Sequence, residues 1–288
     1  MMEFHSQMVP EGHMNQKSAQ TSGSAWVHCF KPQDAAAVRL FCLPFSGGGA
    51  QSFNGWAERL PSGIELCAIQ LPGRETRMRE APFSDVHALI DAMAPALERW
   101  LDKPMVLFGH SMGALIAYEL ARRLQQEHAR PPRCLIVSGR VAPHRSLPQS
   151  AVNKLPQPEF ISRLRQLGGT PDELLNNTEL MELITPTLRA DFALHEEYSH
   201  RVGMRLQCDI LAFGGISDPQ AGRSAINDWR DVTDGRFQLR MVPGGHFFIQ
   251  SAQSLFLRIL SMELYSSLRL LLTPHPGGAA RVANVNPG

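Results

Sequence analysis

The chain has 288 residues, and its 28 lysine and arginine residues nearly balance its 27 aspartate and glutamate residues, leaving a formal net charge of +1. This balance argues against a protein whose main task is binding nucleic acid, because such proteins usually carry a strong basic excess. A hydrophobic content of 43% with 19% charged residues is ordinary for a soluble globular protein and excludes intrinsic disorder over most of the chain.

Both ends of the chain are expected to be flexible extensions of one domain. Residues 1–25 are polar, and residues 273–288 are rich in Pro and Gly, so we predict a leader, a domain over residues 26–272 and a tail. No signal peptide and no run of 18 apolar residues is visible, and the five cysteines lack CxxC spacing. We therefore expect a cytoplasmic protein in a reducing compartment, without membrane contact.

Within this domain, short apolar runs alternate with amphipathic segments of helix length. The runs predicted as strands are Val38–Leu43, Glu65–Leu71, Met105–Phe108, Cys134–Ser138, Asp209–Phe213 and Phe237–Val242. Helices are predicted near residues 84–101, 112–127, 220–231 and 250–270. Strands that are apolar on both faces are typical of a buried parallel sheet. The alternation predicts an α/β fold with a mostly parallel central sheet flanked by helices.

One interval, about residues 142–206, contains no convincing strand. Helical stretches are predicted there near residues 157–167, 172–184 and 187–200. The interval is too long for a simple crossover, and structureless loops of that length are rare. We predict a helical insertion that covers one edge of the sheet as a lid.

The strongest chemical signal is the pentapeptide G-H-S-M-G at residues 109–113, a G-x-S-x-G pattern. Such a pattern recurs by chance, but here the apolar run Met105–Phe108 leads into it and an amphipathic helix follows. Strand, sharp turn and helix are the setting of a nucleophile elbow, in which the turn forces a serine into a strained backbone conformation. We predict Ser111 as a nucleophile; the alternative is a tight turn with an incidental serine.

A serine nucleophile needs a base that an acid orients, and in this architecture the acid and then the base follow the serine along the chain. Asp218 comes just past the strand predicted to end at Phe213, whereas Asp209 begins that strand at the wrong end. His246 follows the last predicted strand in a glycine-containing loop. We predict Asp218 as the acid and His246 as the base; the alternatives are a capping aspartate and a surface histidine. His110 is expected to pack beneath the turn.

Two backbone N–H groups are needed to hold the oxyanion that forms at the reacting carbonyl. One is expected from Met112, and the other from Ser46 or Phe45, in the glycine-rich loop after the first central strand. A phosphate-binding loop is the rival interpretation of this loop, but no Gly-Lys-Ser/Thr follows and no G-x-G-x-x-G pattern is present. No histidine pair has HExxH or similar spacing, so no metal site is predicted.

Six segments of the chain carry a resemblance to a known family. They are Leu40–Gly48, Gln70–Glu75, Gly109–Gly113, Arg189–Phe192, Phe213–Gly215 with Asp218, and Pro243–Phe248. Their order resembles that of type II thioesterases, the stand-alone editing enzymes of nonribosomal peptide and polyketide synthases, over about residues 38–260. The resemblance implies an α/β-hydrolase fold with a helical lid and the same roles for Ser111, Asp218 and His246. It also implies hydrolysis of acyl or aminoacyl thioesters on the phosphopantetheine arm of acyl or peptidyl carrier proteins, without a cofactor.

The loop after the second predicted strand carries Arg74, Arg77 and Arg79. They form either a solvated face or a surface that docks a carrier protein or the phosphate of its arm. The rival functions are a small-molecule ester hydrolase or a medium-chain fatty acyl thioesterase on the same fold, and a non-catalytic interaction module. We expect a monomer that acts with carrier proteins.

Overall fold

The computed structural model describes residues 25–128, 131–145 and 151–272. Apart from residue 25, the predicted leader and tail lie outside these residues. The strands are β1 Val27–His28, β2 Val38–Leu43, β3 Ile64–Ile69, β4 Met105–His110, β5 Cys134–Ser138, β6 Asp209–Gly215 and β7 Phe237–Val242. The α-helices are α1 Val86–Leu97, α2 Met112–His128, α3 Gln157–Leu167, α4 Asp172–Leu175, α5 Thr178–Glu196, α6 Arg223–Asn227, α7 Phe248–Ser251 and α8 Gln253–Leu272.

In the described chain, seven strands form one sheet in the order β1-β3-β2-β4-β5-β6-β7. The six strands from β2 to β7 run parallel, which confirms the predicted α/β class. Strand β1 was not predicted; it has two residues and pairs antiparallel with β3 at the sheet edge. Because all parallel strands end at the same edge, the loops after β2, β4, β5, β6 and β7 can meet there.

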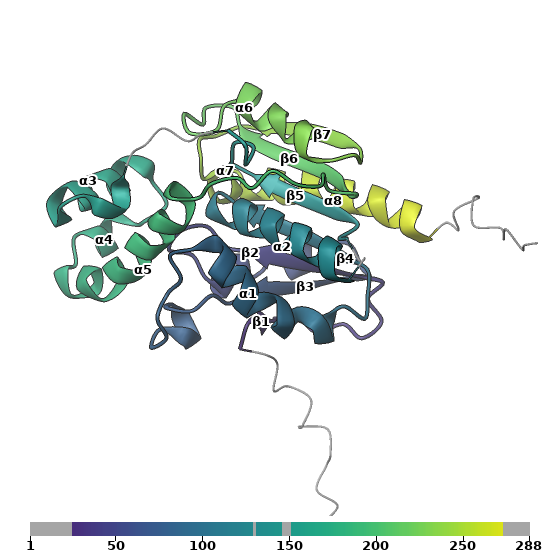
Figure 1. Ribbon diagram of the computed structural model, residues 1–288, viewed down its shortest axis with the longest axis horizontal. Helices are drawn as coiled ribbons and strands as arrows, with labels where there is room; N and C mark the ends of the chain where they lie inside the picture. Colours follow the sequence, from purple (N-terminus) through teal and green to yellow (C-terminus); the bar gives the residue numbers. More distant parts are fainter. Residues whose placement is uncertain (1–24, 129–130, 146–150, 273–288) are drawn as a thin grey trace, which may run out of the picture.

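Helices cover both faces of the sheet, as Figure 1 shows with α1 and α2 in front and α8 behind. Alternate residues of β2 enter different cores: Phe41 and Leu43 pack with α1 and α2, whereas Leu40 and Cys42 pack with α8. This two-sided burial explains why the strand sequences are continuously apolar. No helix in the described residues is long and apolar enough to cross a membrane.

The predicted insertion is helical and carries a small core of its own. Helices α3, α4 and α5 stand apart from the sheet, at the left in Figure 1. Their shared apolar cluster is Val152, Phe160, Leu164, Leu175, Met181, Leu188 and Phe192. The insertion therefore packs as a unit over the edge where the parallel strands end.

The helix boundaries in the insertion differ from the prediction at two places. The predicted helix 172–184 is broken, because the side chain of Asn177 accepts a hydrogen bond from the N–H of Leu180 (3.0 Å) and caps the start of α5. The predicted break near residue 186 is absent, and α5 continues through Pro186. Burial of Leu188 and Phe192 in the insertion core outweighs the helix bond that proline removes.

The turn between β4 and α2 requires a glycine at residue 113. A Cβ on Gly113 would lie 2.2 Å from the carbonyl oxygen of Leu43 and 2.6 Å from that of Pro44. Leu43 ends β2 and Pro44 begins the glycine-rich loop, so a side chain here would force α2 away from this backbone.

We expect Gly113→Ala to lower the free energy of unfolding by about 1–3 kcal/mol, because the backbone atoms that the new methyl group would meet cannot move aside as a flexible side chain can. Chemical denaturation would measure the loss. Gly222→Ala is the matched control, since no atom lies within 4 Å of a Cβ built there. Equal stability of the two variants would contradict the close approach.

Candidate active site

Ser111 lies in the sharp turn between β4 and α2, in the strained conformation that the pentapeptide predicts. Its φ is 53°, a left-handed value that is uncommon for a residue with a side chain. The N–H of Ser111 donates to the carbonyl oxygen of Ser138 at the end of β5 (2.8 Å), which holds the turn. The strained serine thus lies at the carboxyl edge of the sheet, beside the pocket described below.

Ser111, His246 and Asp218 form a continuous hydrogen-bonded chain. His246 Nε2 lies 3.0 Å from Ser111 Oγ, and His246 Nδ1 lies 2.9 Å from Asp218 Oδ2. The other oxygen of Asp218 accepts from the N–H of Gln220 at 2.8 Å, which fixes the carboxylate. Since a carboxylate can only accept, Nδ1 carries the proton and Nε2 is left able to accept one from the serine. The three residues arrive from the loops after β4, β6 and β7.

His110 packs beneath the turn, as expected from the sequence. Its Nδ1 lies 2.9 Å from Ser138 Oγ, and its ring centroid lies 5.2 Å from that of His246. Burial, with a smaller contribution from the nearby His246, lowers the pKa of His110 well below its ordinary value. His110 therefore stays neutral and places no second positive charge beside His246.

The glycine-rich loop after β2 lines the same pocket as Ser111, through Phe45 and Ser46. The N–H of Gly47 donates to Asp191 Oδ2 (2.7 Å), and the N–H of Gly48 donates to the carbonyl oxygen of Phe45 (2.9 Å). These two amides are thereby engaged, which leaves Ser46 or Phe45 as the donors to consider in this loop. Met112 is the first residue of α2, where a helix leaves the N–H without an intrahelical partner.

A buried ion pair that was not predicted from the sequence joins the insertion to this loop. Asp191, on α5, is 1% exposed and accepts from Arg74 Nη1 (2.8 Å) and Nη2 (2.7 Å) as well as from Gly47. Arg74 Nη1 also donates to the carbonyl oxygen of Gly48. The signal available in the sequence was that Arg74 and Asp191 each lie in a segment quoted for the family resemblance.

The sequence left Arg74, Arg77 and Arg79 as either a solvated face or a docking surface, and both alternatives are wrong for Arg74 and Arg77. Arg74 is buried against Asp191, and Arg77 is buried, with its guanidinium 4.2 Å from the Trp26 ring centroid. The physical reason is that each cation has a carboxylate partner, Asp191 for Arg74 and Glu80 for Arg77, and that the Trp26 ring also covers Arg77. Of the three, Arg79 alone is exposed.

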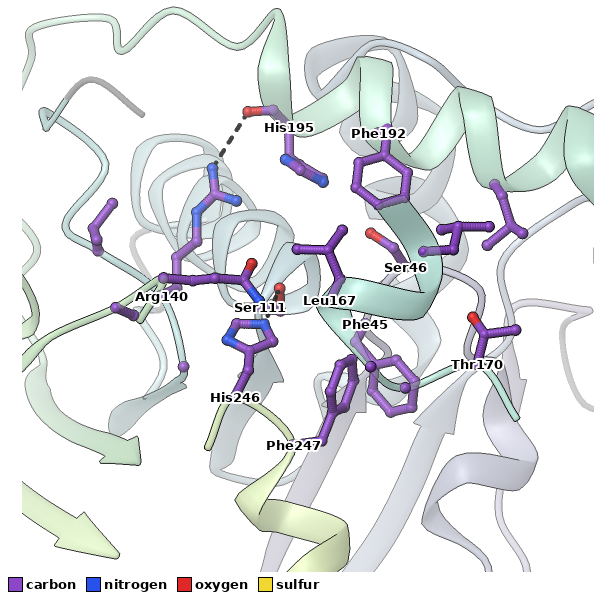
Figure 2. Close-up of a pocket in the computed structure, with 18 residues that line it drawn as sticks. Phe45, Ser46, Ser111, Arg140, Leu167, Thr170, Phe192, His195, His246 and Phe247 are labelled. Atoms are coloured by element: carbon purple, nitrogen blue, oxygen red, sulfur yellow. Dashed lines mark hydrogen bonds between the residues drawn. The ribbon is translucent and has the colours of Figure 1, made fainter. Parts of the chain in front are cut away.

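A pocket opens between this edge of the sheet and the insertion (Figure 2). Ser111 and His246 lie at its floor, and α3 and α5 supply its far wall. The lining residues are Phe45, Ser46, Ser111, Gly139, Arg140, Val141, Leu164, Leu167, Gly168, Gly169, Thr170, Leu188, Phe192, His195, Gln220, Ala221, His246 and Phe247. The wall is mostly apolar with a few polar groups, which suits a small organic group. Within the described residues, no cluster of three His, Cys, Asp or Glu side chains could hold a metal ion.

We expect Asp191→Ala to lower the free energy of unfolding by about 3–5 kcal/mol, because it leaves the buried Arg74 without its counter-charge. Denaturant titration would measure this. Asp172→Ala is the control, since it removes an exposed ion pair with Arg165 and is expected to cost less than about 1 kcal/mol. A small and equal effect of both variants would show that the Asp191 pair does not hold the insertion.

Comparison with known proteins places these features in a family. Residues 38–263 match the thioesterase domain family. The chain is 40% identical over 250 residues to linear gramicidin dehydrogenase LgrE of Brevibacillus parabrevis, covering 86% of this chain and 95% of that protein. It is 37% identical to thioesterase PikA5 of Streptomyces venezuelae, covering 82% and 84% of the two chains.

The fold agrees with solved structures of this kind. The type II thioesterase BorB from the borrelidin biosynthetic cluster superposes with a TM-score of 0.78 at 34% identity, covering 85% of this chain and 99% of that chain. The predicted α/β-hydrolase fold is thereby confirmed. The family match, the curated relatives and the structural similarity agree, and the chain belongs to the thioesterase family.

Proposed function

We propose that this protein is a serine thioesterase that removes acyl or aminoacyl groups from the phosphopantetheine arm of carrier proteins, and so edits stalled or misprimed nonribosomal peptide or polyketide synthases. The observation that carries the proposal is the hydrogen-bonded chain from Ser111 through His246 to Asp218 at the floor of an apolar pocket. The relatives named above include a protein called a thioesterase and one from a borrelidin cluster, which supports this class of substrate.

The geometry supports a two-step acyl transfer. Ser111 Oγ attacks the thioester carbonyl while His246 Nε2 accepts the hydroxyl proton, and the oxyanion is held by the N–H groups of Met112 and of Ser46 or Phe45. The thiolate leaves and takes the proton from His246, which yields the free thiol and an acyl-serine. Water then attacks the acyl-serine with His246 as base, releasing the acid and restoring Ser111. Asp218 orients His246 and stabilises its cation.

One relative is named a dehydrogenase, which would require transfer of a hydride. Hydride transfer draws on a dinucleotide cofactor, whose binding turn uses a G-x-G-x-x-G pattern. This chain does not contain that pattern. The hydrogen-bonded serine, histidine and aspartate instead favour acyl transfer, which needs no cofactor.

We propose that the insertion at about residues 142–206 acts as a lid over the pocket and that a carrier protein, working in the cytoplasm beside its synthase, moves it. The lid has an apolar core of its own, and its contacts with the site include the buried Asp191–Arg74 ion pair and the bond from the N–H of Gly47 to Asp191. A lid excludes water from the acyl pocket between turnovers. Carrier-protein contact with this region would couple docking to pocket opening.

Removing the proposed catalytic groups should abolish turnover while preserving the fold. We expect Ser111→Ala to form no acyl-enzyme and His246→Ala to lose about 10⁴-fold or more in kcat, because the two act as a unit. Asp218→Asn should lose somewhat less. The rate of hydrolysis of an acyl-carrier thioester would be measured through the release of the free thiol. Ser254→Ala, an exposed serine on α8, should match the wild type. Activity above about one tenth of wild type in Asp218→Asn would mean that another acid serves His246.

Delivery by a carrier protein should raise efficiency. We expect a carrier-bound acyl thioester to be cleaved with kcat/KM at least about tenfold above that of the same acyl group on N-acetylcysteamine, because the partner adds binding energy remote from the reacting bond. Agreement of the two values within about twofold would contradict the carrier-protein assignment and favour a small-molecule ester hydrolase. A series of acyl lengths would identify a medium-chain fatty acyl preference.

A further inference from the structure

Arg140 is a buried cation in the pocket that has no counter-charge among the described residues. It follows β5, lines the pocket with Ser111 and is 7% exposed. Its Nε has no hydrogen-bond partner there, and Nη2 makes one long contact, 3.4 Å to the carbonyl oxygen of His195. Buried guanidinium groups are normally paired with a carboxylate, so this arginine departs from the usual pattern.

The groups around Arg140 leave its charge uncompensated. No ion pair of Arg140 is found among the described residues, and its electrostatic neighbour Tyr198 donates its hydroxyl to Glu119 (2.6 Å), which Arg122 Nη1 also binds (3.2 Å). His195 is buried, and burial, followed by the charge of Arg140, lowers its pKa well below the ordinary value, so its ring is neutral. Burial also lowers the pKa of Arg140 to about 10, which still leaves it charged at neutral pH.

A second unpartnered polar atom lies in the same wall of the pocket. His195, on α5, also lines the pocket, and its buried Nδ1 has no hydrogen-bond partner among the described residues. Figure 2 shows Arg140 rising beside Ser111 and His246 with its guanidinium toward His195. Two side chains with unsatisfied polar atoms therefore face a pocket whose lining is mostly apolar.

We propose that Arg140, with His195 beside it, is a specificity subsite for a carboxylate at the far end of a short acyl group. The inference deepens the proposed function by naming its substrate class: dicarboxylic acyl thioesters such as malonyl, succinyl or glutaryl groups. A guanidinium binds a carboxylate through two parallel hydrogen bonds, and the charge pair would compensate the buried cation. The carboxylate does not react; it orients the acyl chain so that the thioester carbonyl lies at Ser111.

The test compares acyl groups of equal shape that differ in charge. Malonyl, succinyl and glutaryl thioesters would be compared with isovaleryl, 4-methylpentanoyl and 5-methylhexanoyl thioesters on the same carrier protein. In each pair an isopropyl group replaces the terminal carboxylate. We expect the wild type to favour the carboxylate by at least about tenfold in kcat/KM for one pair, as one charge-assisted bidentate contact would give. A wild-type ratio at or below one for all three pairs would overturn the proposal.

Arg140→Met keeps the length of the side chain and removes the charge. We expect this variant to lower the ratio of kcat/KM for the carboxylate acyl group to kcat/KM for its branched counterpart to about one or below. Its kcat/KM on the branched acyl groups should stay within about threefold of wild type. Equal losses on both kinds of substrate would assign Arg140 a structural role and overturn the proposal. Arg122→Met is the control, a buried arginine outside the pocket, and should leave the preference unchanged. Arg140→Lys keeps the positive charge and should keep part of the wild-type preference for the carboxylate acyl group.

The same reagents separate failure of the subsite from failure of the proposed function. If the wild type hydrolyses no acyl thioester, the proposed function fails. Binding at the subsite is then measured by how far a thioester slows the labelling of Ser111 by a fluorophosphonate. Succinyl-N-acetylcysteamine should slow the labelling more strongly than 4-methylpentanoyl-N-acetylcysteamine in the wild type and equally in Arg140→Met. Equal protection in the wild type would overturn the subsite. The labelling needs no turnover, so it reads the subsite independently of hydrolysis.

Discussion

The strained turn at Ser111 is the constraint on which the rest of the site depends. A left-handed serine between a buried strand and a buried helix persists only where the surroundings hold it. Here the bond to Ser138 ties the turn to β5, and the close approach of Gly113 to the carbonyl oxygens of Leu43 and Pro44 ties it to the loop after β2. The turn, the candidate oxyanion loop and the neighbouring strand therefore form one rigid unit. Asp218 and His246 need only reach this fixed point from the ends of β6 and β7.

The insertion is coupled to that unit through charge. Asp191 accepts from Gly47 and from both terminal nitrogens of Arg74, so a residue of α5 fixes the loop that lies beside Ser111. Any movement of α5 must either carry this loop or break a buried ion pair, which is costly. Lid position and the geometry of the candidate oxyanion donors are thereby linked. Arg140 and His195 meet across the same boundary, which places the proposed carboxylate subsite where the sheet and α5 adjoin.

The sequence predicted the features that follow from local pattern. Continuous apolar runs indicated the parallel strands, and the positions of Asp218 and His246 after two of those strands predicted that they would approach Ser111. The pairing of Arg74 with Asp191 could not be predicted this way, because 117 residues separate the two and either could have been solvated. Arg74 and Arg77 were interpreted as part of a charged surface because local sequence pattern does not show that their side chains are buried. Strand β1 has too few residues to give a period, and helix α5 continues through Pro186 because tertiary packing outweighs a local preference.

The measurement that tests the central claim most directly is the location of the acyl group on the enzyme. Rapid quenching during turnover of an acyl-carrier thioester, followed by peptide mapping with mass spectrometry, would detect the covalent intermediate. The account predicts an acyl group on the peptide that contains Ser111, at the hydroxyl that lies 3.0 Å from His246 Nε2. An acyl group attached to any other side chain, or the same acylation of Ser111→Ala, would contradict it.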